Sequence, residues 1–465
     1  MKVSYKVLNK LSALTMVLLF AGLSTAQENK APEMLTLDEC IQIALGNNSS
    51  LKTSEYSNDA SKLDELGSYR GILPNVDISA SKGEYETGPS VYLSDEPIGV
   101  DPATGEVIYE QRVRRTAKSI RKTNNAGLSV DQMVFDGGNW WNQIRQAKAN
   151  KRSSDFGLES DRNNVILSVQ EAYFDLLKQV RLLEAYELAV QRSEGQLNRT
   201  QKMFELGATA RLDVYRSQVN LGNDKISLLT QGNAVRSAKN KLNLAMGRDP
   251  LEPIKVQATL DVPESLPTPE DLIETAFGNQ PLLKKNEADI KSQDLAVSLA
   301  KGSLSPNISL YLNYDRRNEE LDRVWSGFDQ NYTLSYGVYL SFNLFNGFSD
   351  YVTIQKAKIA KRTAEENYEE YKRNLKSTIY QYYDNYKSYL SIIEINRQNL
   401  EAAKEELRLA EERYQIGAGT TLDVREAQVN LMIAEQTLIE SQYNSLISLA
   451  QIDNQLGLTY EKISN

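Results

Sequence analysis

The sequence predicts a mainly α-helical protein with a small β part, built from two copies of one unit. The stretch GATARLDVYRSQVNL at 207–221 returns as GAGTTLDVREAQVNL at 417–431, and nine of the fifteen positions are identical. Residues 139–206 contain no proline, so at 1.5 Å per residue they can form a helix of about 100 Å. Residues 333–344 alternate polar and apolar side chains, which is typical of a strand with two different faces.

The first residues of the chain have the features of a signal peptide. Three lysines and an apolar stretch at 11–23 precede Ser24-Thr25-Ala26, and we expect cleavage before Gln27. The apolar stretch is shorter than the roughly 20 residues that a membrane-spanning helix needs. The predicted organisation is a signal peptide at 1–26, a first repeat at 27–249, a proline-rich linker at 250–270 and a second repeat at 271–465, with both repeats in one protomer.

Each repeat reads as a helix, two strands, a very long helix and a return helix. Apolar residues recur every seven positions along both long helices, which indicates left-handed supercoiling around a neighbour. An ordinary coiled-coil stalk would show the same period. The predicted seam consists of Val169, Leu176, Leu183, Val190, Leu197 and Phe204 in the first copy, and Ile379, Tyr386, Ile393, Leu400, Leu407 and Tyr414 in the second.

Three further segments, 76–80, 128–135 and 308–314, read as weaker strands. Four strands cannot close a barrel and open edges are not tolerated in lipid, so a membrane barrel would need other chains. A strand half-buried in a soluble sandwich would alternate in the same way. The segments at 83–123 and 315–331 are expected to be extracellular loops. Aromatic residues gather where the predicted strands are followed by helices: Phe135, Trp140, Trp141, Phe345 and Phe348. They fit either an aromatic belt at a membrane interface or packing at the strand–helix junction.

The composition argues against most catalytic chemistry. The chain has no histidine, which removes the commonest general base and metal ligand, and we find no phosphate-binding glycine loop or nucleophile motif. We therefore expect no enzyme, no metal site and no cofactor. Its single cysteine, Cys40, is expected to be a small buried residue of the first helix. A net charge of −9 disfavours nucleic acid as a partner.

The ordered duplication, with a G-x-x-x-x-x-D-V motif beginning at Gly207 and again at Gly417, resembles the TolC family of outer-membrane efflux proteins. The resemblance covers essentially the whole chain after the signal peptide. It implies a homotrimer in the outer membrane, with four strands per protomer in one twelve-stranded β-barrel and a long α-helical barrel across the periplasm. It also implies a passive exit duct for efflux or type I secretion, driven by an inner-membrane transporter through a periplasmic adaptor protein.

The resemblance also implies roles for particular residues. Gly207 and Gly417 mark the helical turns at which family members dock on the adaptor. Asp423 and Glu426 match acidic positions of the periplasmic entrance, and three chains would place them in rings that favour cations. Tyr414 and Asp213 match a tyrosine and an aspartate that latch the entrance through a hydrogen bond. Gly419 stands where some members carry a latch arginine, so that bond is the latch element expected here.

Other interpretations remain open from the residues alone. Asp213 and Asp423 also fit the first turn of a helix, where the helix dipole favours an acid, and Tyr414 continues the apolar seam. The two glycines fit the left-handed position that follows a helix. A non-channel periplasmic coiled-coil protein is the main alternative function, and a carboxylate-based hydrolase is another.

Overall fold

The computed structural model describes residues 34–258, 263 and 265–459, so the predicted signal peptide at 1–26 lies outside the described residues. The described chain divides into two compact units, each with segments of both repeats. The first unit contains the residues up to Ser54, Glu159–Gln280 and the chain from Arg373 onwards; the second contains Glu55–Leu158 and Pro281–Lys372.

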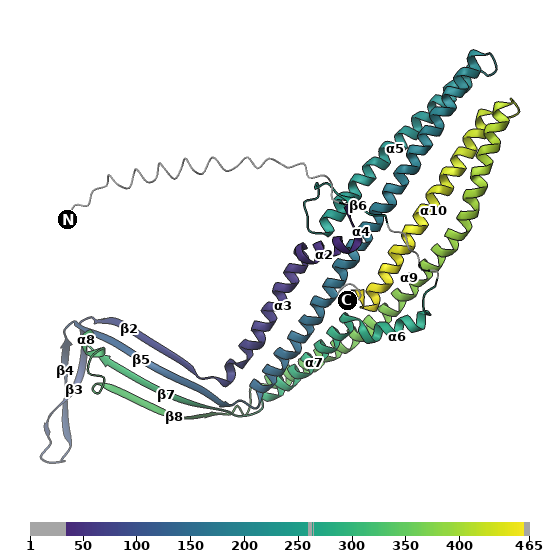
Figure 1. Ribbon diagram of the computed structural model, residues 1–465. Coiled ribbons are helices and arrows are strands. Elements are labelled where there is room, and N and C mark those ends of the chain that lie inside the picture. Colours follow the sequence, from purple (N-terminus) through teal and green to yellow (C-terminus); the bar gives the residue numbers. More distant parts are fainter. Residues whose placement is uncertain (1–33, 259–262, 264, 460–465) are drawn as a thin grey trace, which may run out of the picture. The chain divides into compact units, whose positions relative to one another are not determined.

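Two helices of 67 residues each, α4 (Asn139–Glu205) and α9 (Ser349–Gln415), confirm the predicted long helices. Each is followed by a tight turn and a return helix, α5 (Arg211–Ala245) or α10 (Thr421–Leu456). In the first unit these helices form two antiparallel pairs, α4 with α5 and α9 with α10 (Figure 1).

The predicted seven-residue seam is buried along most of its length. Val169, Leu176 and Val190 are buried in α4, as are Ile379, Tyr386, Ile393, Leu407 and Tyr414 in α9. The prediction is wrong for Phe204, which is 42% exposed. The reason is that the inward-facing positions towards the end of α4 are polar, namely Ser193, Gln196 and Thr200.

The helix before the strands is interrupted in both repeats. The first repeat has α2 (Leu37–Asn47) and α3 (Ser49–Ser68), followed by the short 3-10 helix η1 (Tyr69–Ile72). The second has α6 (Pro269–Asn279) and α7 (Pro281–Gly302). A short parallel ladder joins β1 (Met34–Leu35) to β6 (Lys255–Val256). Cys40 is fully buried in α2 as predicted, and this burial raises the pKa of its thiol to about 11.

The second unit contains a four-stranded antiparallel sheet with the order β2-β5-β7-β8. Its strands are β2 (Asn75–Thr87), β5 (Ser119–Phe135), β7 (Asn307–Asn318) and β8 (Tyr332–Ser341), so all four predicted strands are present and three are longer than predicted. Among the described residues, the two edge strands, β2 and β8, each have a neighbouring strand on one side only.

The register gives this sheet one apolar and one polar face. Strand partners place Val76, Val130, Leu312 and Tyr336 in one cross-strand row, and Ile78, Leu128, Tyr314 and Leu334 in a parallel row. The opposite face carries the rows Asp77, Ser129, Asn313, Ser335 and Ser79, Gly127, Asp315, Thr333. Side chains alternate between the faces of a strand, so this separation extends across all four strands.

The segment 83–123, expected to be a loop, contains regular strands. Strands β2 and β5 continue into this segment, and β3 (Ser90–Val100) pairs with β4 (Val107–Thr116) in a separate hairpin. Residues of this hairpin alternate, so that Leu93 faces its partner Val113 while Ser94 faces Arg112 on the other side. This period-2 pattern favours a strand pair over a loop, because it gives each face cross-strand partners of one kind.

The other predicted loop, 315–331, is organised around one arginine. Arg316 is 2% exposed, and one terminal nitrogen of its guanidinium, Nη2, lies within hydrogen-bond distance of four backbone carbonyls, those of Arg323, Ser326, Gly327 and Gln330. It also lies 4.7 Å from the centre of the Phe328 ring. The short helix α8 (Leu321–Val324) forms within this loop.

Arg316→Met should therefore release the loop. Losing the donor leaves several carbonyls unsatisfied, and we expect the free energy of local opening to fall by about 2 kcal/mol. Chymotrypsin should then cut faster at the exposed Trp325 and Phe328. The exposed neighbour Arg317→Met is the control, because Arg317 makes one side-chain hydrogen bond, to Asn125. Equal cleavage of both variants would contradict the proposed role of Arg316.

In the part of the chain that the structure describes, no helix combines the length and apolar character needed to cross a membrane.

Candidate functional site: the helical turns

The two turns that join the long helices to the return helices have the same backbone. Gly207 and Gly417 both have φ of +72°, which confirms their predicted left-handed conformation. The next residue in each turn, Ala208 or Ala418, donates its N–H to the carbonyl five residues earlier. This is the hydrogen-bond pattern of a Schellman motif, which satisfies carbonyls that the helix end leaves free. Local chemistry therefore explains both glycines.

Asp423 forms a capping box at the start of α10. Its carboxylate accepts from the backbone N–H of Thr420 at 2.9 Å, while the Thr420 hydroxyl accepts from the Asp423 N–H at 3.2 Å. These bonds, from the Thr420 backbone first and its side chain second, lower the pKa of the Asp423 carboxyl. Glu426 lies three residues later, is exposed, and makes no hydrogen bond or ion pair with any described residue. The two carboxylates therefore share one helix face.

Because the pKa of Asp423 is lowered on folding, its stabilising contribution is complete above the ordinary carboxyl pKa and is lost as the pH falls through the lower folded value. Asp423→Ala should consequently reduce the denaturant midpoint at pH 7, and the difference from the wild type should disappear as the pH falls through the lowered folded pKa of this carboxyl. Chemical denaturation at several pH values, followed by circular dichroism, checks this. A difference that persists unchanged at low pH would show that Asp423 does not act through its charge.

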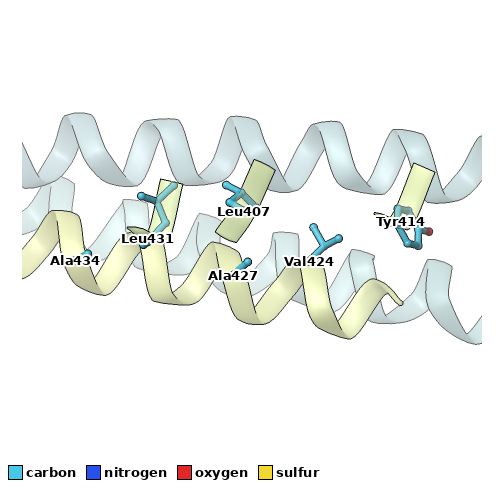
Figure 2. Packing of buried hydrophobic residues seen from close by; sticks show 7 residues of the cluster. Leu407, Tyr414, Val424, Ala427, Leu431 and Ala434 are labelled. Atoms are coloured by element: carbon cyan, nitrogen blue, oxygen red, sulfur yellow. The ribbon is translucent and has the colours of Figure 1, made fainter. Parts of the chain in front are cut away.

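The prediction of a hydrogen bond between Tyr414 and Asp213 is wrong. Among the described residues, the Tyr414 hydroxyl has Thr200 as its hydrogen-bond partner, at 3.2 Å. Tyr414 is 3% exposed and packs into an apolar cluster with Leu407, Val424 and Ala427 (Figure 2). The seam position of Tyr414 thus directs its ring inward against α4 and α10, and its partner Thr200 also accepts a hydrogen bond from Ser217 of α5.

Asp213 makes a different contact between the two repeats. Its carboxylate accepts from the hydroxyl of Thr209 in its own turn at 2.8 Å, and from the hydroxyl of Thr421 in the second repeat at 3.1 Å. Arg216 lies 3.7 Å away. Two separate hydrogen bonds, Tyr414 to Thr200 and Thr421 to Asp213, therefore link the repeats near the turns.

The strongest polar contact between the repeats near the turns was not predicted. Arg425 in α10 donates two hydrogen bonds to Asp224 in α5, at 2.7 and 3.0 Å, and Ser193 of α4 also donates to Asp224. The side chains of Arg425 and Asp224 are 24% and 15% exposed. We call Ser193, Asp224 and Arg425 the inter-repeat clasp. A paired guanidinium and carboxylate that are partly shielded from water interact more strongly than an exposed pair.

Further along the same helices, Arg192 of the first repeat binds Glu435 of the second at 3.1 and 3.4 Å.

Comparison of the two repeats could have predicted the clasp from the sequence. The positions equivalent to Asp224 and Arg425 are Ala434 and Tyr215, so each charge is present in one copy only. Such complementary departures from the repeat are expected where the two copies contact each other.

Gly419 lies close against the end of α9. A Cβ atom placed there would approach Arg413 and the backbone nitrogen of Tyr414 to about 3.2 Å. Any larger residue at this position would require a small shift of the turn. Glycine has no side chain that could form the ion pair that the resemblance assigns to an arginine here. The contacts that link the repeats near the turns are those described above.

Around the turns, aliphatic side chains are exposed at equivalent places in both copies. Leu206 and Ile416 are 84% and 80% exposed, and Leu212 and Leu422 are 56% and 67% exposed. A groove of about 450 Å³ runs between the starts of α5 and α10, beside Tyr215 and Val219. Exposed aliphatic side chains that lie together are typical of contact sites for other proteins.

Comparison with known proteins places this architecture in a family. The family model "Outer membrane efflux protein" matches residues 40–248 and 272–458. Outer membrane protein TolC of Vibrio cholerae is 25% identical over 361 residues, which cover 75% of this chain and 81% of that protein. A probable efflux pump outer membrane protein, TtgC of Pseudomonas putida, is 23% identical over 431 residues, covering 90% of this chain and 82% of that protein.

Solved structures show the same fold. A crystal structure of CusC superposes with a TM-score of 0.75 at 15% identity, covering 90% of this chain and 91% of that one. VceC of Vibrio cholerae superposes with a TM-score of 0.73 at 17% identity, covering 90% and 96%. The TolC-like fold class predicted from the sequence, with its helical barrel and β part, is therefore confirmed. The chain belongs to the outer membrane efflux protein family, a family of channel proteins, and is an outer-membrane exit duct that extends into the periplasm.

Proposed function

We propose that three copies of this chain form one passive conduit, in which the two repeats of each chain together make one protomer. The observation that carries the proposal is the two-faced sheet with two open edges. In lipid an unpaired strand edge costs several kcal/mol per group, so β2 of one copy must pair with β8 of the next. Three copies of four strands give a twelve-stranded barrel, with the apolar rows towards lipid and the polar rows towards water.

The oligomeric state tests this directly. Light scattering of the purified chain in detergent should give the protein mass of three copies of 52.4 kDa, less the signal peptides. A folded monomer would overturn the proposal, because its two sheet edges would remain open. The alternative of a non-channel coiled-coil spacer explains the helical seam and leaves the two faces of the sheet unexplained.

We further propose that the turns at Gly207 and Gly417 dock on a periplasmic adaptor protein held by an inner-membrane transporter. The exposed aliphatic residues that recur at both turns support this. The transporter supplies energy and selects the substrate, so the duct needs no catalytic group. Asp213, Tyr414, Asp423 and Glu426 belong to the periplasmic entrance, which the contacts between repeats hold narrow.

Charging the turns should abolish docking. Leu206→Glu with Ile416→Glu places two carboxylates at the exposed turns. We expect the amount of adaptor that co-purifies with the trimer to fall by more than about tenfold, which is the effect of losing the central residues of a protein interface. Leu188→Glu with Ile395→Glu, at positions 50% and 58% exposed on the helix shafts, is the matched control. Equal adaptor recovery from both double variants would place the docking surface elsewhere.

A further inference from the structure

A groove in the second unit carries an unusual excess of positive charge. It has a volume of about 550 Å³ and lies between the first part of α4 and α7. Three hydrogen bonds hold these helices side by side: Ser292 to Asn150 at 2.6 Å, Ser153 to Asp289 at 2.5 Å, and Gln146 to the Ser292 carbonyl at 3.3 Å. The floor is apolar, and the lining includes five cations and one acid: Arg145, Lys148, Arg152, Lys284, Lys291 and Glu287.

Among the described residues, four of these five cations have no acidic partner. Within the described residues, Arg145, Lys148, Arg152 and Lys284 have no carboxylate within 4.0 Å. Lys291 has Asp294 at 3.5 Å, and that carboxylate also binds Lys361 at 2.8 Å. The acid of the groove, Glu287, accepts a hydrogen bond from Tyr368. The protein carries a net charge of −9, so this concentration of positive charge is a local feature.

Two of the cations converge on one aromatic ring. The guanidinium of Arg152 lies 5.6 Å from the centre of the Phe156 ring, and the ammonium of Lys284 lies 6.0 Å from the same centre. Like charges gathered around one ring repel each other, and the ring offsets only part of this cost. An anion bound between them would remove the repulsion.

In the proposed trimer, the groove lies away from the sheet edges at which other copies add. Helix α4 follows β5 and α7 leads into β7, and these are the two central strands of the sheet. Another copy that extends the sheet adds at β2 or β8. The floor residues Ala149 and Ala288 are small, so an elongated ligand can lie along the groove without displacing large side chains.

We propose that this groove binds a ligand with two or more phosphate groups. Arg145, Lys148 and Arg152 lie on one face of α4 and span about 10 Å along its axis, which suits phosphates arranged in series. Arginine and lysine are the side chains that bind phosphate most strongly. A soluble polyphosphate and a diphosphate lipid headgroup share this chemistry. The binding needs neither transport nor the adaptor.

Isothermal titration of the purified full-length protein in detergent with inorganic tripolyphosphate tests the site. The double variant Arg152→Gln with Lys284→Gln should bind tripolyphosphate more than about tenfold more weakly than the wild type does. Added salt should weaken binding to the wild type. Arg397→Gln with Lys404→Gln removes the same charge from exposed positions of α9 and is the control. Arg145→Gln with Lys148→Gln, at the other end of the groove, repeats the test if the first variant fails to fold.

Nanodiscs separate the two sources of phosphate. Loss of tripolyphosphate binding in cardiolipin nanodiscs, with binding retained in phosphatidylcholine nanodiscs, would assign the groove to a lipid headgroup. Binding retained in both would assign it to a soluble polyphosphate. No binding by the wild type, or equal affinity in the wild type, the groove variants and the control, would overturn the proposal.

Discussion

Asp224→Ala is expected to open the channel entrance and to destabilise the helical part of the protein. The substitution leaves the Arg425 guanidinium, which is 24% exposed, without its carboxylate partner. Breaking a fully buried pair costs about 3–5 kcal/mol, and the partial exposure here reduces this to about 2 kcal/mol. Ser193 loses its acceptor in the same step. The clasp joins α5 to α10, so its loss removes the strongest of the polar contacts that link the two repeats near the turns.

Uptake of a large antibiotic by cells that produce the variant measures the opening, and the urea midpoint measures the stability. Lys225→Ala is the control, because Lys225 follows Asp224 in the same helix and forms an exposed ion pair with Glu194. Exposed ion pairs contribute only about 0–1 kcal/mol to stability. The charge-reversed variant Asp224→Arg with Arg425→Asp should restore part of both properties. Unchanged uptake and an unchanged midpoint in Asp224→Ala would contradict a role for the clasp.

Asp423→Asn with Glu426→Gln is expected to remove most of the cation selectivity of the pore. Three copies place six carboxylates around the proposed entrance, and a narrow opening lined by one sign of charge concentrates counter-ions by tenfold or more. We therefore expect the cation-to-anion permeability ratio to fall by about tenfold, and block by divalent cations to weaken. Asparagine at 423 can still accept the capping hydrogen bond from Thr420, so the helix start should remain intact.

Reversal potentials across a planar bilayer under a salt gradient measure this ratio. The charge-matched control is Glu366→Gln with Glu370→Gln, two exposed positions of α9 that lie more than 40 residues before Tyr414 in the chain. A selectivity that is the same in both double variants and the wild type would place the carboxylates away from the conducting path.

The sequence predicts the large elements well for a physical reason. Long helices and two-faced strands repeat the same local pattern many times, so Asn139–Glu205 and Tyr332–Ser341 could be recognised without knowledge of their partners. The two glycine turns follow from the same local logic, because their left-handed backbone is determined within a few residues.

Contacts between distant segments could not be predicted in this way. Tyr414 binds Thr200, and Asp213 binds Thr421, because packing of the two repeats decides which polar group each hydroxyl meets. Asp224 and Arg425 are 201 residues apart, and neither has a charged equivalent in the other repeat. The hairpin of β3 and β4 was missed because its many charged residues resemble those of a solvated loop, although its cross-strand pairing is regular.

Single-channel current in a planar bilayer tests the central claim, that copies of this chain form a duct held narrow by contacts between its repeats. Purified wild-type trimer should give small discrete steps, and Asp224→Ala should give larger steps under the same voltage. The absence of discrete steps from folded, oligomeric Asp224→Ala protein would contradict the account.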